Sequence, residues 1–209
     1  INGEKMYIEN TIIIEGLDGA GTTTQARLIG EKFQKEGREV FLTHEPTDNP
    51  IGKVVRQVLQ KKISTTPEAL ALLFSSDRDD HLYNEEYGIL RQVKENRIVI
   101  SDRYFYSSIA YQGVQCDMGF VENINSRFPH PRYLIFIDTL PSVCMDRIER
   151  RGSEKEIFEK QDFLSRVRTG YLKQLENLPE GVKLLRVNGE KSIEEIEEEI
   201  WLWLKENGF

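Results

Sequence analysis

The chain has 209 residues, of which 39% are hydrophobic and 30% are charged. These values are ordinary for a globular enzyme, and the length fits a single α/β domain over residues 1–209. The net charge of −7 argues against a nucleic-acid partner, because binding to duplexes needs a basic surface. A small anionic ligand is compatible with this charge, since a few arginines can gather in one cleft.

The cysteine pattern and hydropathy indicate a cytoplasmic protein. Cys116 and Cys144 lie far apart and form neither a metal-binding pair nor a disulfide framework. No apolar run reaches the length of a membrane span, and residues 1–10 contain no apolar signal core. We therefore expect no membrane partner.

Short apolar runs alternate with longer amphipathic segments along the chain. In chain order, the pattern predicts a strand at Thr11–Glu15, a helix at Thr23–Glu36, a strand at Glu39–Thr43, helices at Ile51–Lys61 and Pro67–Lys94 (broken near Gly88), strands at Arg97–Ser101 and Arg132–Ile137, helices at Pro141–Arg150 and Gln161–Asn177, a strand at Lys183–Val187 and a helix at Ser192–Lys205. Strands followed by helices predict a five-stranded parallel sheet with helices on both faces, a three-layer αβα fold.

The acidic run Glu194–Glu199 is the one segment whose composition suggests metal binding. Its spacing instead favours the solvated face of the last helix, with Ile193, Ile196, Ile200 and Leu204 facing inward.

A glycine-rich turn follows the first predicted strand and precedes the first predicted helix. Gly16 and Gly21 match the glycines of the phosphate-binding pattern GxxxxGK[ST], and Thr23 matches its Ser/Thr position, which contacts Mg²⁺. Glycines let backbone amides converge on phosphate oxygens, and the helix start adds positive partial charge. We expect the phosphates of ATP to bind at Gly16, Gly19, Ala20, Gly21, Thr22, Thr23 and Thr24. The structural alternative is a turn that only connects the strand to the helix and binds no ligand.

Thr22 occupies the position of the lysine in this pattern. Threonine carries no charge and is too short to reach the β- and γ-phosphates. The missing cation weakens transition-state stabilisation unless another cation replaces it.

Several further segments occur in a specific order and spacing: EGLDGAGTTTQ, HEP, LLFSSDRDDH, DRYFYSSIAYQG and RVRTGYL. Together they make the chain similar to bacterial thymidylate (dTMP) kinases from about Thr11 to about Tyr171. The resemblance implies a P-loop NTPase-type fold of the nucleoside-monophosphate kinase kind, transfer of the γ-phosphoryl group of ATP to dTMP with Mg²⁺, and a homodimer.

The resemblance also assigns roles around the acceptor phosphate. Asp102 would orient Mg²⁺, and Arg103 would hold the phosphate with its planar guanidinium. Asp18 would approach the sugar and the metal. Glu45 matches an acidic residue of the family's TREP segment, in which His44 here replaces the arginine, and Arg56 would contact the monophosphate. The alternatives are ordinary surface ion pairs, a turn-forming aspartate and a solvated helix arginine.

The resemblance assigns the thymine base to side chains spaced one helical turn apart. Phe74 would stack on thymine and Arg78 would bond its O4 atom, while Ser108 and Gln112 would contact the imide edge. Tyr111 would pack against the deoxyribose and disfavour a 2′-hydroxyl. Without the resemblance, a core phenylalanine beside a solvated arginine is the simpler interpretation.

An arginine cluster marks the expected lid at residues 147–160. Gly19 stands where one subclass of the family carries a loop arginine, so the chain resembles the subclass that uses a lid arginine. The usual DRFE lid segment is here Glu156–Glu159 and lacks its arginine. Arg151 or Arg147 is then the candidate catalytic cation, and either would compensate for Thr22. The alternative is a helix end whose cations favour the helix dipole.

Three other functions stay open at this point. They are a kinase for another nucleoside or monophosphate, a catalytically weakened nucleotide-binding protein, and a GTPase-like switch. The last is poorly supported, because the sequence has no NKxD base-binding segment.

Overall fold

The computed structural model describes residues 7–150 and 161–209. The strands are β1 (Tyr7–Gly16), β2 (Val40–His44), β3 (Ile98–Asp102), β4 (His130–Asp138) and β5 (Lys183–Asn188). The helices are α1 (Thr22–Lys35), α2 (Pro50–Leu59), α3 (Pro67–Tyr83), α4 (Ile89–Lys94), α5 (Phe105–Gln112), α6 (Met118–Asn125), α7 (Pro141–Arg150), α8 (Gln161–Leu175) and α9 (Ile193–Glu206).

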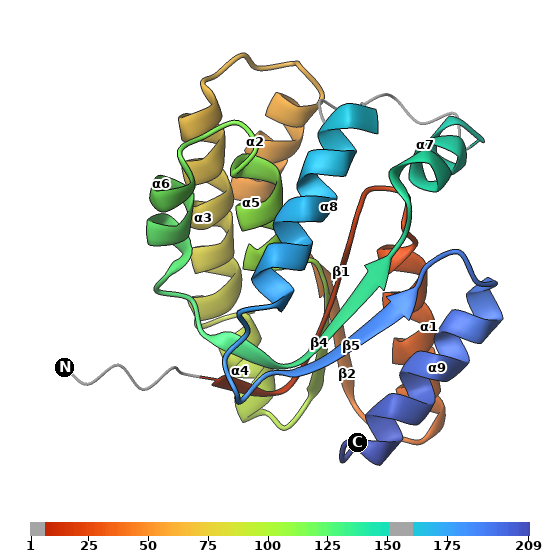
Figure 1. Ribbon diagram of the computed structural model, residues 1–209. Coiled ribbons are helices and arrows are strands. Elements are labelled where there is room, and N and C mark those ends of the chain that lie inside the picture. Colours follow the sequence, from red (N-terminus) through yellow and green to blue (C-terminus); the bar gives the residue numbers. More distant parts are fainter. Residues whose placement is uncertain (1–6, 151–160) are drawn as a thin grey trace.

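The five strands form one parallel sheet in the order β2-β3-β1-β4-β5. Helices α1 and α9 cover one face, and the other face is covered by the group of helices that includes α4, α5 and α8 (Figure 1). The predicted three-layer αβα fold is therefore confirmed. All five carboxyl ends lie along one edge, which is where open parallel sheets bind ligands.

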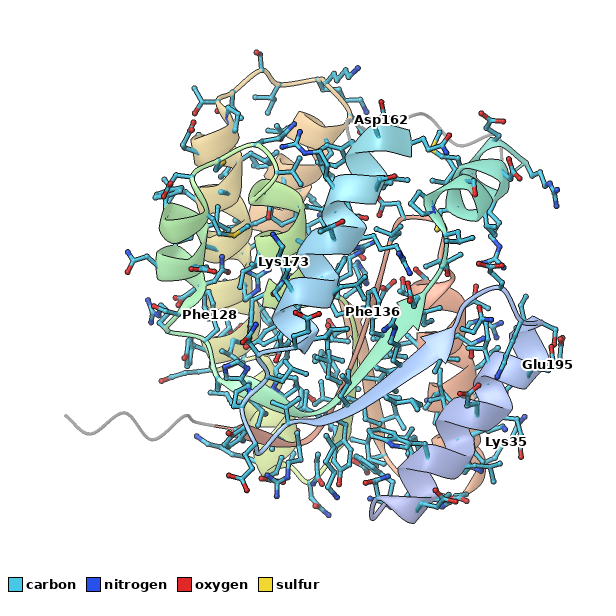
Figure 2. All side chains as sticks on the ribbon, viewed as in Figure 1. Lys35, Phe128, Phe136, Asp162, Lys173 and Glu195 are labelled. Atoms are coloured by element: carbon cyan, nitrogen blue, oxygen red, sulfur yellow. The ribbon has the colours of Figure 1, made fainter. Side chains whose placement is uncertain are left out.

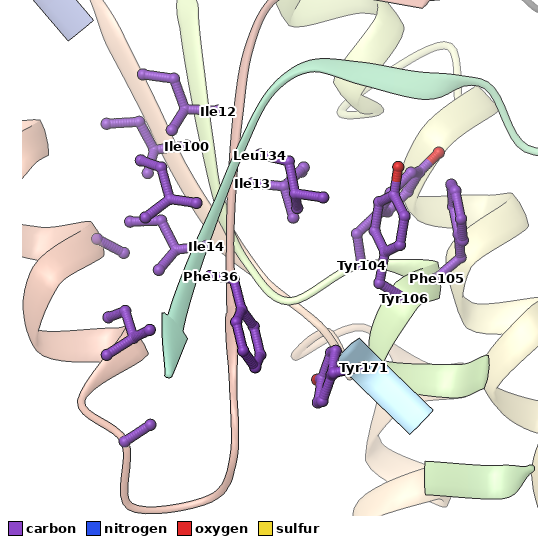
Figure 3. Packing of buried hydrophobic residues seen from close by; sticks show 14 of the residues in the cluster. Ile12, Ile13, Ile14, Ile100, Tyr104, Phe105, Tyr106, Leu134, Phe136 and Tyr171 are labelled. Carbon is purple, nitrogen blue, oxygen red and sulfur yellow. The ribbon is translucent and has the colours of Figure 1, made fainter. Parts of the chain in front are cut away.

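The central strand β1 alternates its side chains between the two layers. Ile12 and Ile14 point to one face together with Ile100, whereas Ile13 points to the other face with Leu134 (Figure 3). These isoleucines are at most 1% exposed. Burial on both faces explains the continuous apolar run, because each residue meets a helix layer whichever way it points.

The predicted helix over Pro67–Lys94 is two helices. Thr66 caps α3 by accepting a hydrogen bond from the Ala69 amide, and α3 ends at Tyr83. Residues 84–88 form a turn before α4, in which the Gly88 amide donates to the Asn84 carbonyl over 2.9 Å. A Cβ on Gly88 would lie 2.5 Å from the Asn84 carbonyl oxygen, so only glycine fits this tight turn.

The solvated-face interpretation of the acidic run is confirmed, with one correction. Ile196, Ile200 and Leu204 are at most 3% exposed, but Ile193 is 51% exposed. Ile193 is the first residue of α9 and lies within the capping box that Ser192 and Glu195 form, in the exposed first turn of the helix. Glu195, at this exposed start of α9, is labelled in Figure 2.

Candidate active site

The glycine-rich turn between β1 and α1 has the backbone shape that a phosphate loop needs. Gly19 and Gly21 adopt φ values of 86° and 103°, in the left-handed region that favours glycine. A Cβ on Gly19 would lie 2.7 Å from the carbonyl oxygen of Cys144 in α7. Helix α1 has neither a side-chain cap nor an acidic residue in its first turn, so its amides are open to an anion.

Thr22 is packed into this loop and supplies no charge to it. Its side chain is 5% exposed, and its Cγ2 atom lies 3.0 Å from where a Cβ on Gly16 would stand. Among residues 7–150 and 161–209, the Thr22 hydroxyl has no hydrogen-bond partner. The position of the missing lysine is therefore filled by a methyl group against glycine.

A cleft of about 400 Å³ opens beside the phosphate loop. Arg147, in the last turn of α7, lines it and donates to the carbonyls of Gly189 (2.9 Å) and Ala20 (3.4 Å). The other lining residues come from the start of α1, the end of α7, the segment before α9 and the first turn of α9: Gly21, Thr24, Gln25, Arg150, Lys191, Ser192, Ile193 and Ile196. Cations thus surround a cleft whose wall is the phosphate loop.

Thr23 and Asp102 meet across the loop, as a shared metal site requires. The Thr23 hydroxyl donates to Oδ2 of Asp102, which is 8% exposed at the end of β3. Asp102 Oδ1 is buried and has no hydrogen-bond partner within the described ranges. A buried carboxylate oxygen without a partner next to a hydroxyl fits Mg²⁺, which prefers oxygen ligands.

Arg103 follows Asp102 and connects the phosphate loop to a second pocket. Its Nη2 atom lies 2.5 Å from Asp18 Oδ1, and its guanidinium carbon lies 5.2 Å from the Tyr111 ring centre. Burial alone would lower the pKa of Arg103, but Tyr111 and Asp18 raise it well above its ordinary value. Arg103 therefore keeps its charge, and its φ of 75° turns it away from β3 into the site.

The second pocket gathers most of the predicted acceptor residues. It is lined by Asp18, Glu45, Phe74, Arg78, Arg103, Ser108, Tyr111 and Gln112, together with Pro46, Leu59, Tyr104 and Ser107. These residues come from the phosphate loop, the segments that follow β2 and β3, and helices α2, α3 and α5. Segments far apart in the sequence therefore form one cavity, and Asp18 belongs both to this cavity and to the phosphate loop.

A buried ion-pair network holds Arg78 in the wall of this pocket. Arg78 donates to Glu45 Oε2 (2.8 Å), Asn125 Oδ1 (2.6 Å) and Ser108 Oγ (2.9 Å). Burial alone would raise the pKa of Glu45, but the charge of Arg78 and a hydrogen bond with His81 hold it below its ordinary value. Glu45, Asn125 and Ser108 therefore fix the Arg78 guanidinium in the wall of the pocket.

Gln112 and Phe74 complete the part of the pocket that would meet a base. Gln112 is 3% exposed, and its Oε1 atom has no hydrogen-bond partner within the described residues. An unpaired buried amide oxygen is an acceptor for an N–H donor such as the imide of thymine. Phe74 is partly buried and packs against the core while lining the cavity.

Arg56 is the one described residue of the predicted acceptor set that does not line this pocket. Arg56 donates to the Pro46 carbonyl and lies 3.4 Å from Asp48, beside the pocket rather than in its wall. Arg151, like most of the predicted lid, lies outside the described residues.

Sequence reasoning missed a buried group beneath Arg103. Ser107 and Tyr171 contact Arg103, and both bind the carboxylate of Glu15. The available signal was an acidic residue at the end of the buried run TIIIE, a position where a carboxylate needs specific partners.

Comparison with known proteins gives consistent matches. The family model described as thymidylate kinase matches residues 14–200. The "Probable thymidylate kinase" of Pyrococcus horikoshii is 40% identical, with 90% of this chain and 92% of that protein covered. A relative from Treponema pallidum, also named for thymidylate kinase, is 36% identical, with 95% and 96% covered. The relatives include archaeal proteins, so the similarity is not restricted to bacterial enzymes.

Proposed function

The chain belongs to the thymidylate kinase family, and we propose that it transfers the γ-phosphoryl group of ATP to dTMP, giving ADP and dTDP. The observation that carries this proposal is the Asp18–Arg103 pair, which joins the phosphate loop to the pocket of Phe74, Arg78 and Gln112. A donor phosphate on the loop and an acceptor phosphate at Arg103 would then lie next to each other.

Phosphoryl transfer to dTMP requires alignment of the two phosphates and neutralisation of their charge, and it requires no general base. The acceptor oxygen of dTMP belongs to an ionised phosphate, so no proton has to be removed from it. Arg103 would hold this phosphate, while the amides of the loop and the start of α1 would hold the ATP phosphates. Thr23 and Asp102 would hold Mg²⁺, which neutralises phosphate charge when bound.

Thymine recognition is proposed for the far end of the acceptor pocket. Phe74 would stack on the ring, Arg78 would donate to O4, and Gln112 Oε1 would accept from the imide N–H. Ser108 already accepts from Arg78, so its role would be to fix Arg78. Tyr111 receives a hydrogen bond from the Asp18 amide over 2.9 Å, which places its ring where it would exclude a 2′-hydroxyl.

Arg147 is the proposed substitute for the lysine that Thr22 replaces. It reaches the Ala20 carbonyl from α7 and lines the donor cleft. Helix α7 packs directly on the loop, because the Cys144 carbonyl would contact any side chain at Gly19. Arg151 and a lid over residues 147–160 remain part of the proposal through the family resemblance.

A variant pair tests this substitution. Arg147→Ala should lower kcat for dTMP phosphorylation by about 100-fold, in the range found for removal of one transition-state donor. Adding Thr22→Lys to Arg147→Ala should restore part of that loss, because a loop lysine supplies the same charge. Full turnover of Arg147→Ala would show that the guanidinium is not needed.

The function itself is tested by a coupled assay of ADP release with dTMP, dUMP, dCMP and thymidine in parallel. We expect dTMP to be the best acceptor and Arg103→Met to abolish its use. Arg127→Ala is the matched control, because Arg127 is an exposed arginine paired with Asp79 outside the site. Equal activity of Arg103→Met and Arg127→Ala would contradict the proposal, and a better acceptor than dTMP would identify a different monophosphate kinase.

A catalytically weakened nucleotide-binding protein is the second candidate. The uncharged, buried Thr22 favours it. Tight dTMP binding without ADP release in the wild type, with turnover only in Thr22→Lys, would establish this second function.

The family resemblance also leads us to propose a homodimer. Leu72 in α3 and Met118 in α6 are large apolar side chains that are 48% and 39% exposed, as expected for a helical surface that a second copy covers. Sedimentation equilibrium should give twice the chain mass. The cytoplasmic location stays a prediction, and no helix of the described residues is long and apolar enough to cross a membrane.

A further inference from the structure

The buried carboxylate of Glu15 lies beneath the site without lining either cavity. Glu15 is the penultimate residue of β1, directly before Gly16 of the phosphate loop, and is 1% exposed. Strand alternation places it on the same face of the sheet as Ile13, toward α5 and α8 (Figure 3). A carboxylate buried this deeply is stable only with several hydrogen-bond donors, so its partners indicate its role.

Two of these donors belong to the first turn of α5. Glu15 Oε1 accepts from the backbone amides of Tyr104 (2.8 Å) and Ser107 (3.2 Å). The N-cap residue Tyr104 provides no side-chain cap, so a carboxylate from β1 satisfies these amides instead. Glu15 thereby fixes the start of the helix that carries Ser108, Tyr111 and Gln112.

The other two donors connect Glu15 to Arg103. Glu15 Oε2 accepts from the hydroxyls of Ser107 (2.5 Å) and Tyr171 (2.8 Å). Arg103 Nη1 donates to the same two oxygens over 3.1 and 3.3 Å. The two hydroxyl oxygens also lie 2.7 Å from each other. When their hydrogens go to Glu15, the lone pairs of both oxygens are left to accept from Arg103. Asp18 holds the other side of the guanidinium.

We propose that Glu15 is a positioning residue, which fixes Arg103 toward the acceptor phosphate by orienting the hydroxyls of Ser107 and Tyr171. This inference rests on the proposed role of Arg103 as the phosphate-binding residue. It predicts that the polarity of Glu15, and not only its volume, controls how well Arg103 binds phosphate.

Glu15→Gln separates polarity from volume. The glutamine oxygen can still accept from the two α5 amides, so the helix cap is kept. Its NH₂ group would face the hydroxyls of Ser107 and Tyr171, which must then turn their hydrogens toward Arg103. The hydroxyl hydrogens would then face the N–H groups of Arg103, and the guanidinium would lose the two hydroxyl oxygens as neutral acceptors.

The experiment measures the affinities of dTMP and thymidine by titration calorimetry. Thymidine lacks the phosphate, so the ratio of the two affinities reports on Arg103 even without turnover. Glu15→Gln should weaken dTMP binding about 10-fold, leave thymidine binding unchanged and lower kcat by about 10- to 100-fold, as small misplacements of a binding group do. Tyr171→Phe, which removes one acceptor, should give a smaller loss in the same direction.

Tyr106→Phe is the matched control for the loss of a buried hydroxyl. Tyr106 lies on α5, and its hydroxyl pairs with His130 at 2.8 Å rather than with the site. An unchanged dTMP-to-thymidine ratio in Glu15→Gln would overturn the inference, whether or not the variant were less stable. A wild type that bound neither ligand would instead refute the proposed function itself.

The pH profile gives a readout that a merely structural role would not move. Burial raises the pKa of Glu15 to about 7, against the opposing effects of Arg103, Ser107 and Tyr171. A protonated Glu15 presents a hydrogen to the hydroxyls, as glutamine does. The amount by which wild type binds dTMP more tightly than Glu15→Gln should therefore be largest at pH 8.5 and smaller at pH 6.

Other titrating groups do not produce this profile. Within the described residues, the titratable side chains that act on Glu15 are Arg103 beside β3, Tyr106 on α5 and Tyr171 on α8, while Tyr104, the N-cap residue of α5, meets Glu15 through its backbone amide. Arg103 stays charged, and the pKa values of Tyr104, Tyr106 and Tyr171 are raised further above neutrality. The phosphate of dTMP titrates equally in both variants and cancels. If the ratio of the dTMP affinities of wild type and Glu15→Gln did not change with pH, the inference would be contradicted.

Discussion

Removing the Glu45 carboxylate should destabilise the protein far more than removing an exposed carboxylate. The side chains of Glu45, Arg78 and His81 are 3%, 1% and 3% exposed. In Glu45→Ala, the charge of Arg78 would stay buried with only the neutral partners Asn125 and Ser108. Breaking one side of a buried pair costs about 3–5 kcal/mol of unfolding free energy. For a chain of this size, that loss lowers Tm by about 6 to 20 °C.

Urea unfolding followed by circular dichroism measures this loss, with the m-value as a check that both variants unfold alike. Glu39→Ala is the control, because Glu39 is 74% exposed and pairs with Arg97 at 3.3 Å on the surface. Exposed pairs contribute about 0–1 kcal/mol. A loss of unfolding free energy below about 1 kcal/mol for Glu45→Ala, equal to that of the control, would refute the claim that Glu45 stabilises the buried charge of Arg78.

The sign of the pH dependence follows from the lowered pKa of Glu45. The native state holds the proton less tightly than the unfolded state, whose pKa is near 4.5. The stability that Glu45 contributes is therefore present above pH 4.5 and is lost as the pH falls below it. The difference in unfolding free energy between wild type and Glu45→Ala should therefore become smaller as the pH falls below 4.5.

Three further predictions concern the base, the metal and Glu15. Phe74→Ala should raise KM for dTMP about 10-fold in steady-state assays, because stacking contributes about 1–3 kcal/mol per base, and an unchanged KM would rule out stacking. Asp102→Asn should raise the Mg²⁺ concentration for half-maximal activity about 10-fold or more, and an unchanged Mg²⁺ titration would exclude Asp102 from the metal site. Because the pKa of Glu15 is raised from 4.5 to about 7, the native state binds this proton more tightly and stability falls as the pH rises through 7. The unfolding free energy of Glu15→Gln minus that of wild type, measured with urea, should therefore be about 2 kcal/mol larger at pH 8 than at pH 5.5. The same difference at both pH values would contradict an ionising Glu15.

The strands and most helices could be predicted because each carries a local signal. The apolar runs fixed the strands to within a few residues, except that β1 begins at Tyr7 rather than Thr11. Helices α5 and α6 were not assigned bounds, because Phe105–Gln112 is rich in aromatic residues and has weak helical periodicity. Ile193 obeyed the helical spacing but lies in the exposed first turn of α9.

The pocket residues were predictable only through the family resemblance, and most of the contacts that hold them in place were not predictable. Phe74 and Gln112 belong to motifs, and the fold brings them together as expected. Asn125, which contacts Arg78, comes from a segment with no motif, and His81 ends the segment LLFSSDRDDH, which by itself does not indicate a bond to Glu45. Such contacts depend on tertiary packing, which short-range sequence patterns do not encode.

The central claim is that one nucleotide lies on the phosphate loop and a thymidine monophosphate lies in the adjoining pocket. A crystal structure with dTMP and a non-hydrolysable ATP analogue tests it most directly. We predict thymine against Phe74, its phosphate on Arg103, and the triphosphate on residues 16–23. A dTMP molecule bound away from Arg103 and Phe74 would contradict the account.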